Sequence, residues 1–496
     1  MKVSARRARE SSPDLFPLIQ QRLERSPQSD FLQFLPGPLN LSGPALLAEI
    51  RRVSDAISRH RLPAGARILV QLSHPLALLM ALPALWELGY VPILTEASPS
   101  PSDQEGRLAS FAPDAVLQDS QEAPKGSQSI FLPPLPILRL VPIATHGRLP
   151  LPAQTVLVRT TSGSTGKPRG VALSARQILA DARNISGTLG LSATTRSLAA
   201  IPLSHAYGFS TLLTPCLLLG VPLVVLEHPI PELFRKALGR HRALFFPGVP
   251  LLFDLLLASR VSQNLLSRLN PAVSSGAPLP PQTARQFAQR TGNPLRNFYG
   301  ASECGAISCE RPPQLTARPG CVGTPLKGVR VILEPAKELS RVAGKRSGRL
   351  VVKGKAVALG YVGVGARPRL FHGRFPTSDL GRMDREGRIF LEGRLDRMIN
   401  VGGRKVFPEE VERVLRRAPG VREVVVLPIA DSLRGESVAA AVVGLNGLRE
   451  AALLGYCREH LAAHRIPRRL LLLPALPRTA RGKVDTARLH SLLTGR

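Results

Sequence analysis

The sequence predicts an α/β protein in which helices pack on sheets of mainly parallel strands. Three observations carry this prediction. Predicted strands alternate with predicted helices, as they do in βαβ units. Hydrophobic residues make up 44% of the 496 residues, which is enough for a large core. After about residue 348, short strands broken by glycine and charged turns replace the alternation.

The predicted organisation is a large N-terminal domain followed by a small C-terminal domain. We expect the large domain, residues 1–395, to hold the parallel-type sheets, their helices and a smaller part made of β-strands. The small domain, residues 396–496, has predicted elements in the order strand, helix, strand, strand, helix, strand. This order indicates a compact α+β domain.

The first predicted elements precede residue 155. Apolar residues at helical spacing predict a helix over residues 46–62, and the apolar run ARILVQLS behind it predicts a buried strand. The stretch PLALLMALPALWELGYVPILT then predicts a helix followed by a strand. The Pro- and Ser-rich residues 118–154 predict an irregular connection with short strands.

The alternation resumes after residue 174. The stretches ARQILADARNISGTLG and PLLFDLLLAS predict helices. Strands are predicted in RSLAAIP, VPLVVLE and HRALFFPGVP. The segments GRLVVKG, GRFPTSDLGRMD and GRIFLEGRLD then predict the strands of the β-structured part.

The chain is strongly basic. Lysine and arginine number 66 against 35 acidic residues, a formal net charge of +31. The basic residues are spread along the whole chain, which favours a solvated basic surface. The functional alternative is an acidic partner such as nucleic acid, anionic lipid or an acidic carrier protein. Because the charge is not clustered with aromatic residues, we do not expect nucleic-acid binding.

Cysteine usage and hydropathy point to a reducing compartment. The five cysteines contain no CxxC pair, so neither a disulfide framework nor a zinc site is predicted. The N-terminal residues lack the apolar core of a secretory signal. The most apolar stretch, residues 212–226, is too short to span a bilayer and is interrupted by proline. We therefore expect a cytoplasmic protein without a transmembrane segment.

The stretch VRTTSGSTGKPRGVALS, residues 158–174, gathers hydroxyls and glycines directly after a predicted strand. It is not a Walker A loop, because Gly163 and Gly166 are only three residues apart and Pro168 follows Lys167. Glycines nevertheless allow backbone N–H groups to point inward, and the hydroxyls add further donors. The loop is therefore suited to wrap phosphates, whereas a polar surface turn is the purely structural interpretation.

The order TSGSTGKPRGV in this loop resembles the signature of the adenylate-forming superfamily. That superfamily includes acyl-CoA synthetases, aryl-CoA ligases, luciferases and the adenylation domains of peptide synthetases. Further stretches resemble its motifs in the same order over about 330 residues: PLSHAYGF at 202–209, SSGAPLP at 274–280, NFYGASECG at 297–305, the hinge region at 378–412 and PRTARGKVD at 477–485.

The resemblance implies two half-reactions. A carboxylic acid attacks the α-phosphate of ATP, which gives an acyl-adenylate and pyrophosphate; a thiol then takes the acyl group and AMP leaves. The phosphates would be held by the loop residues Thr161, Ser162, Gly163, Ser164, Thr165, Gly166 and Lys167. Arg169 stands where the family usually has lysine, which keeps the charge but changes the donor geometry.

The same resemblance assigns the nucleoside and the metal. Tyr299 would stack on adenine, and Asp379 would accept hydrogen bonds from the ribose hydroxyls. Mg²⁺ would be bound by Glu303 together with Thr165. The other residues implied around the nucleotide are Gly276, Ala277, Pro278, Asn297, Phe298, Gly300, Ala301 and Ser302.

The remaining assignments concern the acyl group and the mobile domain. Lys483 is implied as the catalytic lysine, carried by a C-terminal domain that swings about Asp396. Arg394 would reach the ribose or a phosphate, Lys405 the nucleotide or the thiol cofactor, and His205 the substrate carboxylate. Structural alternatives stay open for several of them: a surface charge for Lys405, a core residue for His205 and Tyr299, and a turn residue for Asp379 and Glu303.

The acid and the acceptor are less defined by the sequence. No Asp or Glu occurs between Ala199 and Leu226, where relatives that activate amino acids pair with the substrate ammonium. We therefore expect a fatty or aromatic acid, since an uncompensated charge would be costly to bury. Coenzyme A is the expected acceptor, with the phosphopantetheine of an acyl-carrier protein as the alternative. A catalytically silent nucleotide-binding scaffold is the alternative from another class.

Overall fold

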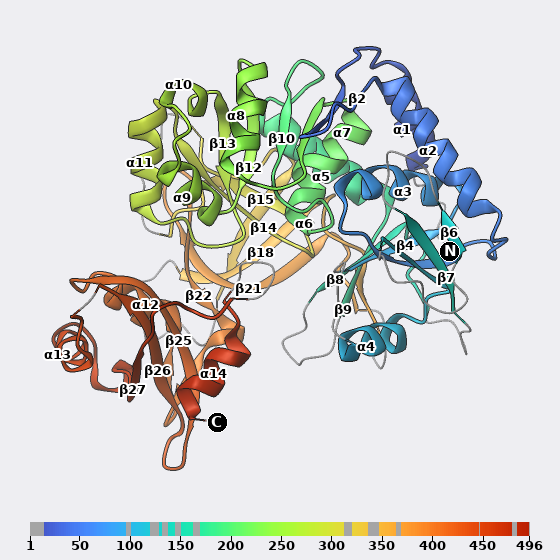
Figure 1. The fold of residues 1–496 in the computed structure, drawn as a ribbon. Helices are drawn as coiled ribbons and strands as arrows, with labels where there is room; N and C mark the ends of the chain where they lie inside the picture. Colours follow the sequence, from blue (N-terminus) through green and yellow to red (C-terminus); the bar gives the residue numbers. More distant parts are fainter. Residues whose placement is uncertain are drawn as a thin grey trace, which may run out of the picture. The chain divides into compact units, whose positions relative to one another are not determined.

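The computed structural model describes residues 14–95, 101–119, 128–130, 137–143, 150–161, 169–311, 320–335, 347–363, 369–445, 447–478 and 484–495. The chain divides into two compact units (Figure 1). The first comprises Met1–Val331 and Val352–Phe375, and the second comprises Ile332–Val351 and Pro376–Arg496. The expected division between residues 395 and 396 stays a prediction.

The first unit contains two large mixed sheets. Over the described residues the first sheet has nine strands, in the order β16 (Thr324–Pro325), β15 (Gly305–Cys309), β14 (Leu295–Ala301), β13 (Leu269–Ser274), β12 (Leu244–Gly248), β10 (Ser197–Ala199), β11 (Leu223–Leu226), β1 (Leu32–Leu35) and β2 (Asn40–Leu41). Its central pairs, from β14 to β1, are parallel, and the pairs at both edges are antiparallel.

The second sheet also has nine strands within the described ranges. Their order is β20 (Arg369–Leu370), β19 (Gly360–Val362), β9 (Arg169–Leu173), β8 (Leu157–Thr161), β4 (Val91–Leu94), β3 (Arg67–Gln71), β5 (Ala115–Gln118), β7 (Leu138–Pro142) and β6 (Gln128–Ile130). The pairs β8–β4, β4–β3 and β3–β5 are parallel. The prediction of an α/β protein with parallel-type sheets is confirmed.

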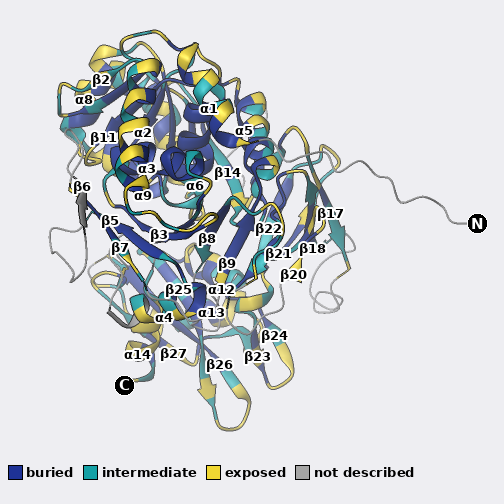
Figure 2. Ribbon diagram, turned by 90° about the vertical axis from the view of Figure 1, so that its right-hand side faces the viewer, coloured by how far each residue is buried: buried dark blue, intermediate teal, exposed yellow. Residues whose placement is uncertain are grey.

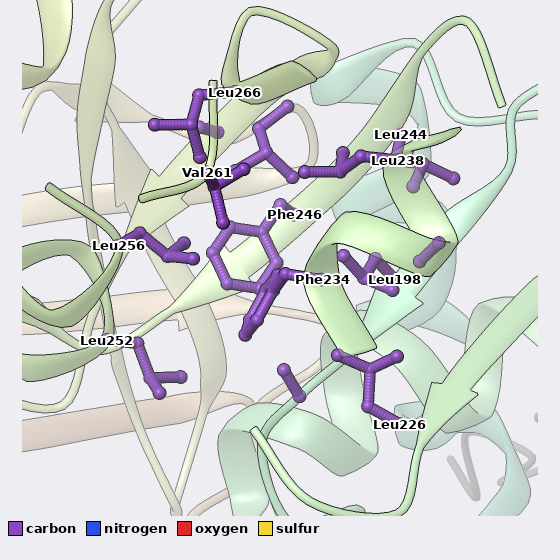
Figure 3. Packing of buried hydrophobic residues seen from close by; sticks show 14 of the residues in the cluster. Leu198, Leu226, Phe234, Leu238, Leu244, Phe246, Leu252, Leu256, Val261 and Leu266 are labelled. Atoms are coloured by element: carbon purple, nitrogen blue, oxygen red, sulfur yellow. The ribbon is translucent and has the colours of Figure 1, made fainter. Parts of the chain in front are cut away.

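Helices cover both faces of the first sheet because alternate residues of a strand point to opposite sides. Leu244 and Phe246 of β12 face one core, which α8 (Pro231–Arg240), α9 (Pro250–Ala258) and α11 (Pro281–Thr291) close. Figure 3 shows this cluster. The rings of Phe234 and Phe246 meet edge to face, with their centroids 5.4 Å apart. Phe245 points to the opposite side, toward Ile185 of α5 (Ala175–Leu189).

Helix α3 (Pro75–Glu87) lies deep in the first unit. Every residue from Leu76 to Trp86 is buried, as expected for a helix that is apolar on all sides (Figure 2). The surrounding helices are more amphipathic: α1 (Leu15–Glu24) and α2 (Gly43–Ser58) bury one face each. The remaining helical segments are α4 (Pro101–Phe111), α6 (Ala206–Gly208), a π-helical turn (Phe209–Leu213), α7 (Thr214–Leu219) and α10 (Gln263–Leu266).

Helix α2 begins and ends earlier than the range predicted from its apolar spacing. Ser42 caps the helix by accepting a hydrogen bond from the N–H of Ala45 at 3.2 Å, and Pro44 occupies the first turn. The helix ends at Ser58, and Arg61 has a left-handed backbone with φ of 49°. Capping chemistry therefore sets these bounds, whereas apolar periodicity marks only the buried face.

The second unit contains the two smaller sheets. The described strands of one are, in order, β17 (Val329–Glu334), β18 (Ser347–Gly354), β21 (Arg374–Met383) and β22 (Ile389–Arg394). Strands β17, β18 and β21 each cross the division between the units. The other is formed by β24 (Arg404–Val406), β23 (Ile399–Val401), β26 (Gly435–Gly444) and β25 (Val421–Asp431), with β27 (Arg469–Leu472) paired to β26.

The C-terminal sheet is sandwiched between helices. Val438, Ala440 and Val442 of β26 face α12 (Pro408–Leu415) and α13 (Glu450–His460). The alternate residues Ala439 and Ala441 face α14 (Thr486–Thr494). The predicted α+β fold of this region is confirmed, and the structure adds β23 before it and α14 after it.

Candidate functional site

The motif at residues 297–305 lies at the carboxyl end of a parallel strand. Strand β13 pairs with β14 in parallel, with Ser274 opposite Asn297, so the residues that follow both strands emerge at one edge of the sheet. Ligands of open α/β sheets bind at this kind of edge. Tyr299 is half-buried there and Gly300 is exposed. A Cβ at Gly300 would lie 2.7 Å from the carbonyl oxygen of Gly305, so the hairpin from β14 to β15 requires glycine.

The predicted adenine-side loop follows β13 directly. Ser275 donates its N–H to the carbonyl of Gly248 at 3.1 Å, which continues the parallel pairing for one more residue. Gly276 then turns the chain away with φ of +86°, a left-handed conformation that favours glycine. Gly276, Ala277 and Pro278 are all exposed.

Two predicted nucleotide residues in β14 turn their side chains elsewhere. Phe298 is buried, with its ring centroid 5.7 Å from that of Tyr207, so it can offer a nucleotide only its backbone. Asn297 donates from its side-chain amide to the carbonyl of Cys321 at 2.8 Å. Its own N–H is held by Glu310 Oε2 at 2.8 Å. Burial raises the pKa of Glu310 to about 7, although the hydrogen bonds from Asn297 and Cys321 act in the opposite direction.

Glu303, the predicted metal ligand, lies in the turn between β14 and β15 and is half-buried. The hydroxyl of Tyr361 donates to its Oε1 at 2.7 Å. The N–H of Ala358 donates to its carbonyl oxygen at 2.8 Å. Burial, and then the neighbouring Glu303, raise the pKa of Tyr361, so its hydroxyl stays a donor at neutral pH. Tyr361 was not predicted from the sequence.

Arg159 supports the same turn from the second sheet. It lies in β8, its side chain is buried, and Nη2 donates to the carbonyl of Ser302 at 2.7 Å. The guanidinium carbon lies 5.4 Å from the ring centroid of Phe209. Burial lowers the pKa of Arg159, while the charges of Asp181, Glu303 and Cys304 counteract this effect. The buried cation thus fixes the backbone one residue before Glu303.

Asp181 completes the support from helix α5. Its Oδ2 accepts from the hydroxyl of Ser210 at 2.6 Å, and Oδ1 accepts from the N–H of Ala306 at 2.9 Å. Burial raises its pKa, and both hydrogen bonds and the charge of Arg159 oppose the increase. The sequence does carry a signal for this residue. Asp181 follows Ile178 by three positions and precedes Ile185 by four, so it lies on the apolar face of the helix.

Most of the predicted phosphate loop lies outside the described residues. This applies to Ser162, Gly163, Ser164, Thr165, Gly166 and Lys167, and likewise to the predicted catalytic Lys483. Thr161 ends β8, and its hydroxyl donates to the carbonyl of Arg169, which begins β9, at 3.4 Å. The guanidinium of Arg169 lies 5.9 Å from the ring centroid of Tyr361. The two strands that flank the loop are therefore held together and connected to the Glu303 turn.

Three predicted residues come together in the second unit. Asp379 and Arg394 are register partners in the β21–β22 pair, and Nη1 of Arg394 lies 3.2 Å from Oδ1 of Asp379. Arg394 also makes a two-point contact with Asp396, at 2.9 and 2.7 Å. Burial alone would raise the pKa of Asp396, but the hydrogen bonds and charge of Arg394 lower it below its ordinary value. Arg394 thus bridges the predicted ribose and hinge carboxylates.

His205 and Lys405 are the last predicted residues that the structure describes. His205 precedes helix α6 as its N-cap and is half-buried. Lys405 lies in β24, opposite Asn400 of β23, and is also half-buried. Their predicted contacts with substrate stay predictions, as do those of the other site residues. None of the helices within the described ranges is long and apolar enough to cross a membrane.

Two family models cover most of the chain. The model of the AMP-binding enzyme family matches residues 19–362, and that of the AMP-binding enzyme C-terminal domain matches residues 410–483. A long-chain-fatty-acid–CoA ligase of Bacillus subtilis is 29% identical over 340 residues, which cover 67% of this chain and 61% of that protein. An indoleacetate–CoA ligase of Aromatoleum aromaticum is 30% identical over 341 residues, 67% and 66% of the two chains. The chain thus matches less than two thirds of the length of these curated relatives.

Solved structures share the fold across nearly the whole chain. ATP-bound MatB from Rhodopseudomonas palustris aligns with a TM-score of 0.81 and 21% identity over 97% of this chain and 99% of that one. An O-succinylbenzoate coenzyme A synthetase from Bacillus subtilis, in complex with AMP, aligns with a TM-score of 0.78 and 23% identity over 97% and 98%. Together with the family models, these matches confirm the resemblance found in the motifs: the chain belongs to the AMP-binding enzyme family, the adenylate-forming superfamily that includes the acyl-CoA synthetases.

Proposed function

We propose that this protein is an ATP-dependent acid–thiol ligase. It activates a carboxylic acid as an acyl-adenylate with release of pyrophosphate, and then transfers the acyl group to the thiol of coenzyme A. The observation that carries the proposal is the arrangement around Glu303. This motif carboxylate follows a strand of the first sheet at its carboxyl end, where open α/β sheets bind ligands, and Arg159 and Tyr361 from the second sheet hold its turn. CoA ligases among the curated relatives support the same reaction class.

The donor set around Glu303 fits Mg²⁺. The half-buried carboxylate of Glu303 is a hard oxygen ligand, which Mg²⁺ prefers together with substrate phosphates. The hydroxyl of Thr165 would be a second ligand of this kind. Bound there, Mg²⁺ would neutralise charge on the phosphate oxygens as the acid attacks the α-phosphate. Lys167 and the backbone N–H groups of the loop would hold the β- and γ-phosphates.

The second unit supplies the ribose contacts and the catalytic lysine in this proposal. Asp379 would accept from the ribose hydroxyls, and Arg394, already paired with it, would keep the carboxylate oriented. Lys483 would bring a positive charge to the acyl carboxylate and the α-phosphate during the first half-reaction. Residues 396–496 would then rotate about Asp396 for thiol transfer, with Lys405 on the newly presented face.

The acid proposed is fatty or aromatic. The stretch around His205, residues 199–226, is apolar and contains no Asp or Glu, and His205 is the polar residue proposed to meet the carboxylate. A long-chain-fatty-acid–CoA ligase and an indoleacetate–CoA ligase both occur among the relatives, which supports these two acid classes. The alternative acceptor is the phosphopantetheine of an acyl-carrier protein, favoured by the net charge of +31. We also propose that the protein acts in the cytoplasm.

A product assay tests the proposed function. Fatty, aryl and amino acids would each be incubated with ATP and Mg²⁺, and with either coenzyme A or a holo acyl-carrier protein. Mass spectrometry would then record the thioester, and a coupled assay the pyrophosphate. We expect a thioester from a fatty or aromatic acid, with pyrophosphate in equal amount. ATP binding without either product, for every acid, would instead identify a nucleotide-binding scaffold.

A further inference from the structure

Tyr361 connects two parts of the proposed ATP site that are far apart in the sequence. It lies in β19, where its register partner is Val171 of β9. Strand β9 begins at Arg169, immediately after the loop at residues 162–168. The hydroxyl of Tyr361 reaches Glu303, which lies in the turn between two strands of the other large sheet. One side chain therefore links the strand that leaves the phosphate loop to the carboxylate proposed for the metal.

The contact with Glu303 divides the roles of the two carboxylate oxygens. The phenol donates to Oε1 at 2.7 Å, an ordinary distance for a hydroxyl-to-oxygen hydrogen bond. An oxygen so engaged is a poorer ligand for a cation, which leaves Oε2 for the metal. The orientation of the carboxylate plane is then set by the position of the phenol.

The ring that carries this hydroxyl is itself held in place. Phe371 packs edge-on against it, with the ring centroids 5.0 Å apart and the ring planes at 86°. Phe375 does so with a centroid distance of 6.4 Å and an angle of 78°. Arg169 lies over the ring face at 5.9 Å. Nearby in the same segment, Ala358 donates to the carbonyl oxygen of Glu303 at 2.8 Å. Residues 358–361 thus hold both the backbone and the side chain of Glu303.

We propose that Tyr361 is a positioning residue for Mg²⁺ binding, acting through Glu303. This inference rests on the proposed function, because it needs a nucleotide site that binds Mg²⁺ with ATP. Without the phenol, Glu303 could rotate, and ordering it again on metal binding would cost free energy. Tyr361→Phe removes only the hydroxyl and keeps the aromatic packing, so it isolates this contact.

The test measures Mg²⁺-linked nucleotide binding instead of turnover. Calorimetry with α,β-methylene-ATP, and no acid present, gives the dissociation constant in EDTA and in saturating Mg²⁺. For the natural chain we expect Mg²⁺ to tighten binding. In Tyr361→Phe the gain in nucleotide affinity on adding Mg²⁺ should shrink about tenfold, as expected for loss of a hydrogen bond to a charged group. The dissociation constant in EDTA should be unchanged. An undiminished gain would overturn the proposal.

Two further variants separate positioning from a general structural effect. Tyr90→Phe is the matched control, because it removes a phenol–carbonyl hydrogen bond, to Leu62 at 3.4 Å, elsewhere in the same unit. It should leave the Mg²⁺ gain unchanged, and an equal loss there would contradict the proposal. In a Glu303→Gln background, Tyr361→Phe should add no further loss of the gain, whereas additive losses would show that Tyr361 does not act through Glu303.

The outcome for the natural chain distinguishes this inference from the proposed function. If the natural chain binds the nucleotide equally well with and without Mg²⁺, the metal site fails and this inference fails with it. If Mg²⁺ tightens binding equally in the natural chain and in Tyr361→Phe, only the role of Tyr361 is overturned. The product assay for the ligase is unaffected by this second result.

Discussion

At the scale of single residues, Glu303 is the carboxylate that we propose as a ligand of Mg²⁺. Its backbone and one oxygen are held by the protein, while the residue stays half-exposed. We predict that Glu303→Gln lowers pyrophosphate release by roughly a hundredfold, because the amide carries no charge for the metal. Unfolding should change little, since the amide oxygen still accepts from Tyr361.

The control for this prediction is Glu459→Gln on the exposed surface of α13, which removes a charge outside every motif. Initial rates over a series of Mg²⁺ concentrations would check both variants. Equal pyrophosphate release by Glu303→Gln and Glu459→Gln would contradict the metal assignment.

Glu310 gives a prediction for pH dependence. Its pKa is raised from 4.5 to about 7 by burial, so the folded state binds a proton that the unfolded state has already lost between these values. Its contribution to stability is therefore present at low pH and disappears as pH rises through about 7. The free energy of unfolding, measured with urea, should therefore decrease between pH 5 and pH 8. Glu310→Gln should remove the part of this decrease that comes from Glu310. An unchanged decrease would show that Glu310 is not its source.

The sequence indicates which residues are neighbours where the predicted site is contiguous. Tyr299, Gly300 and Glu303 lie in one motif, so their neighbourhood follows from the chain itself. Arg159 reaches Ser302 across 143 positions and Tyr361 reaches Glu303 across 58, and no local pattern encodes such contacts. Phe298 shows the opposite limit: inclusion in the motif did not reveal that its side chain belongs to the core.

At the scale of elements, the hairpin from β14 to β15 depends on the buried helix residue Asp181. Replacing Asp181 by alanine would leave the hydroxyl of Ser210 and the N–H of Ala306 without this acceptor, and would remove one of the negative charges near Arg159. We predict that Asp181→Ala lowers the free energy of unfolding by about 3 kcal/mol. Chemical denaturation would measure it.

The matched control is an exposed carboxylate elsewhere in the first unit. Asp254→Ala in α9 removes a carboxylate that accepts from the hydroxyl of Thr283 at 2.7 Å, but Asp254 is exposed. Its loss should cost about 1 kcal/mol or less. A similar cost for both variants would show that the Asp181 network does not stabilise the hairpin.

Elements were predictable to the extent that burial repeats along the chain. The presence of helices α2 and α5 and of strands β3, β12 and β26 follows from their apolar patterns. Their exact ends do not, because the start of α2 depends on the Ser42 cap and on Gly43. A Cβ at Gly43 would overlap the carbonyl oxygen of Leu23 in the neighbouring helix α1. Such close approaches between elements are absent from local periodicity.

At the scale of the whole molecule, the proposed reaction requires residues from both compact units. Glu303 belongs to the first unit, and Asp379, Arg394 and Lys483 belong to the second. Because the family signature runs through both units, the motif order implies that these residues act together, and this stays a prediction. Their joint geometry depends on the movement proposed for the C-terminal domain, and a sequence pattern encodes no such movement.

This division of labour predicts a separation of the two half-reactions. Lys483→Ala should abolish formation of the acyl-adenylate, because the charge that Lys483 brings to the carboxylate and α-phosphate is lost. Thioester formation from supplied acyl-adenylate and coenzyme A should remain largely intact, because that step uses another domain pose. Single-turnover assays of each step would check this. Equal loss of both steps would contradict the role of Lys483 as a mobile adenylation residue.

The central claim is that the chain forms an acyl-adenylate, and acid-dependent exchange of labelled pyrophosphate into ATP tests it most directly. The assay needs no thiol, so it does not depend on whether coenzyme A or a carrier protein is the acceptor. We predict exchange that requires both Mg²⁺ and a fatty or aromatic acid, and that Glu303→Gln and Lys483→Ala suppress it. Absence of acid-dependent exchange across these acids, in a protein that still binds ATP, would contradict the account.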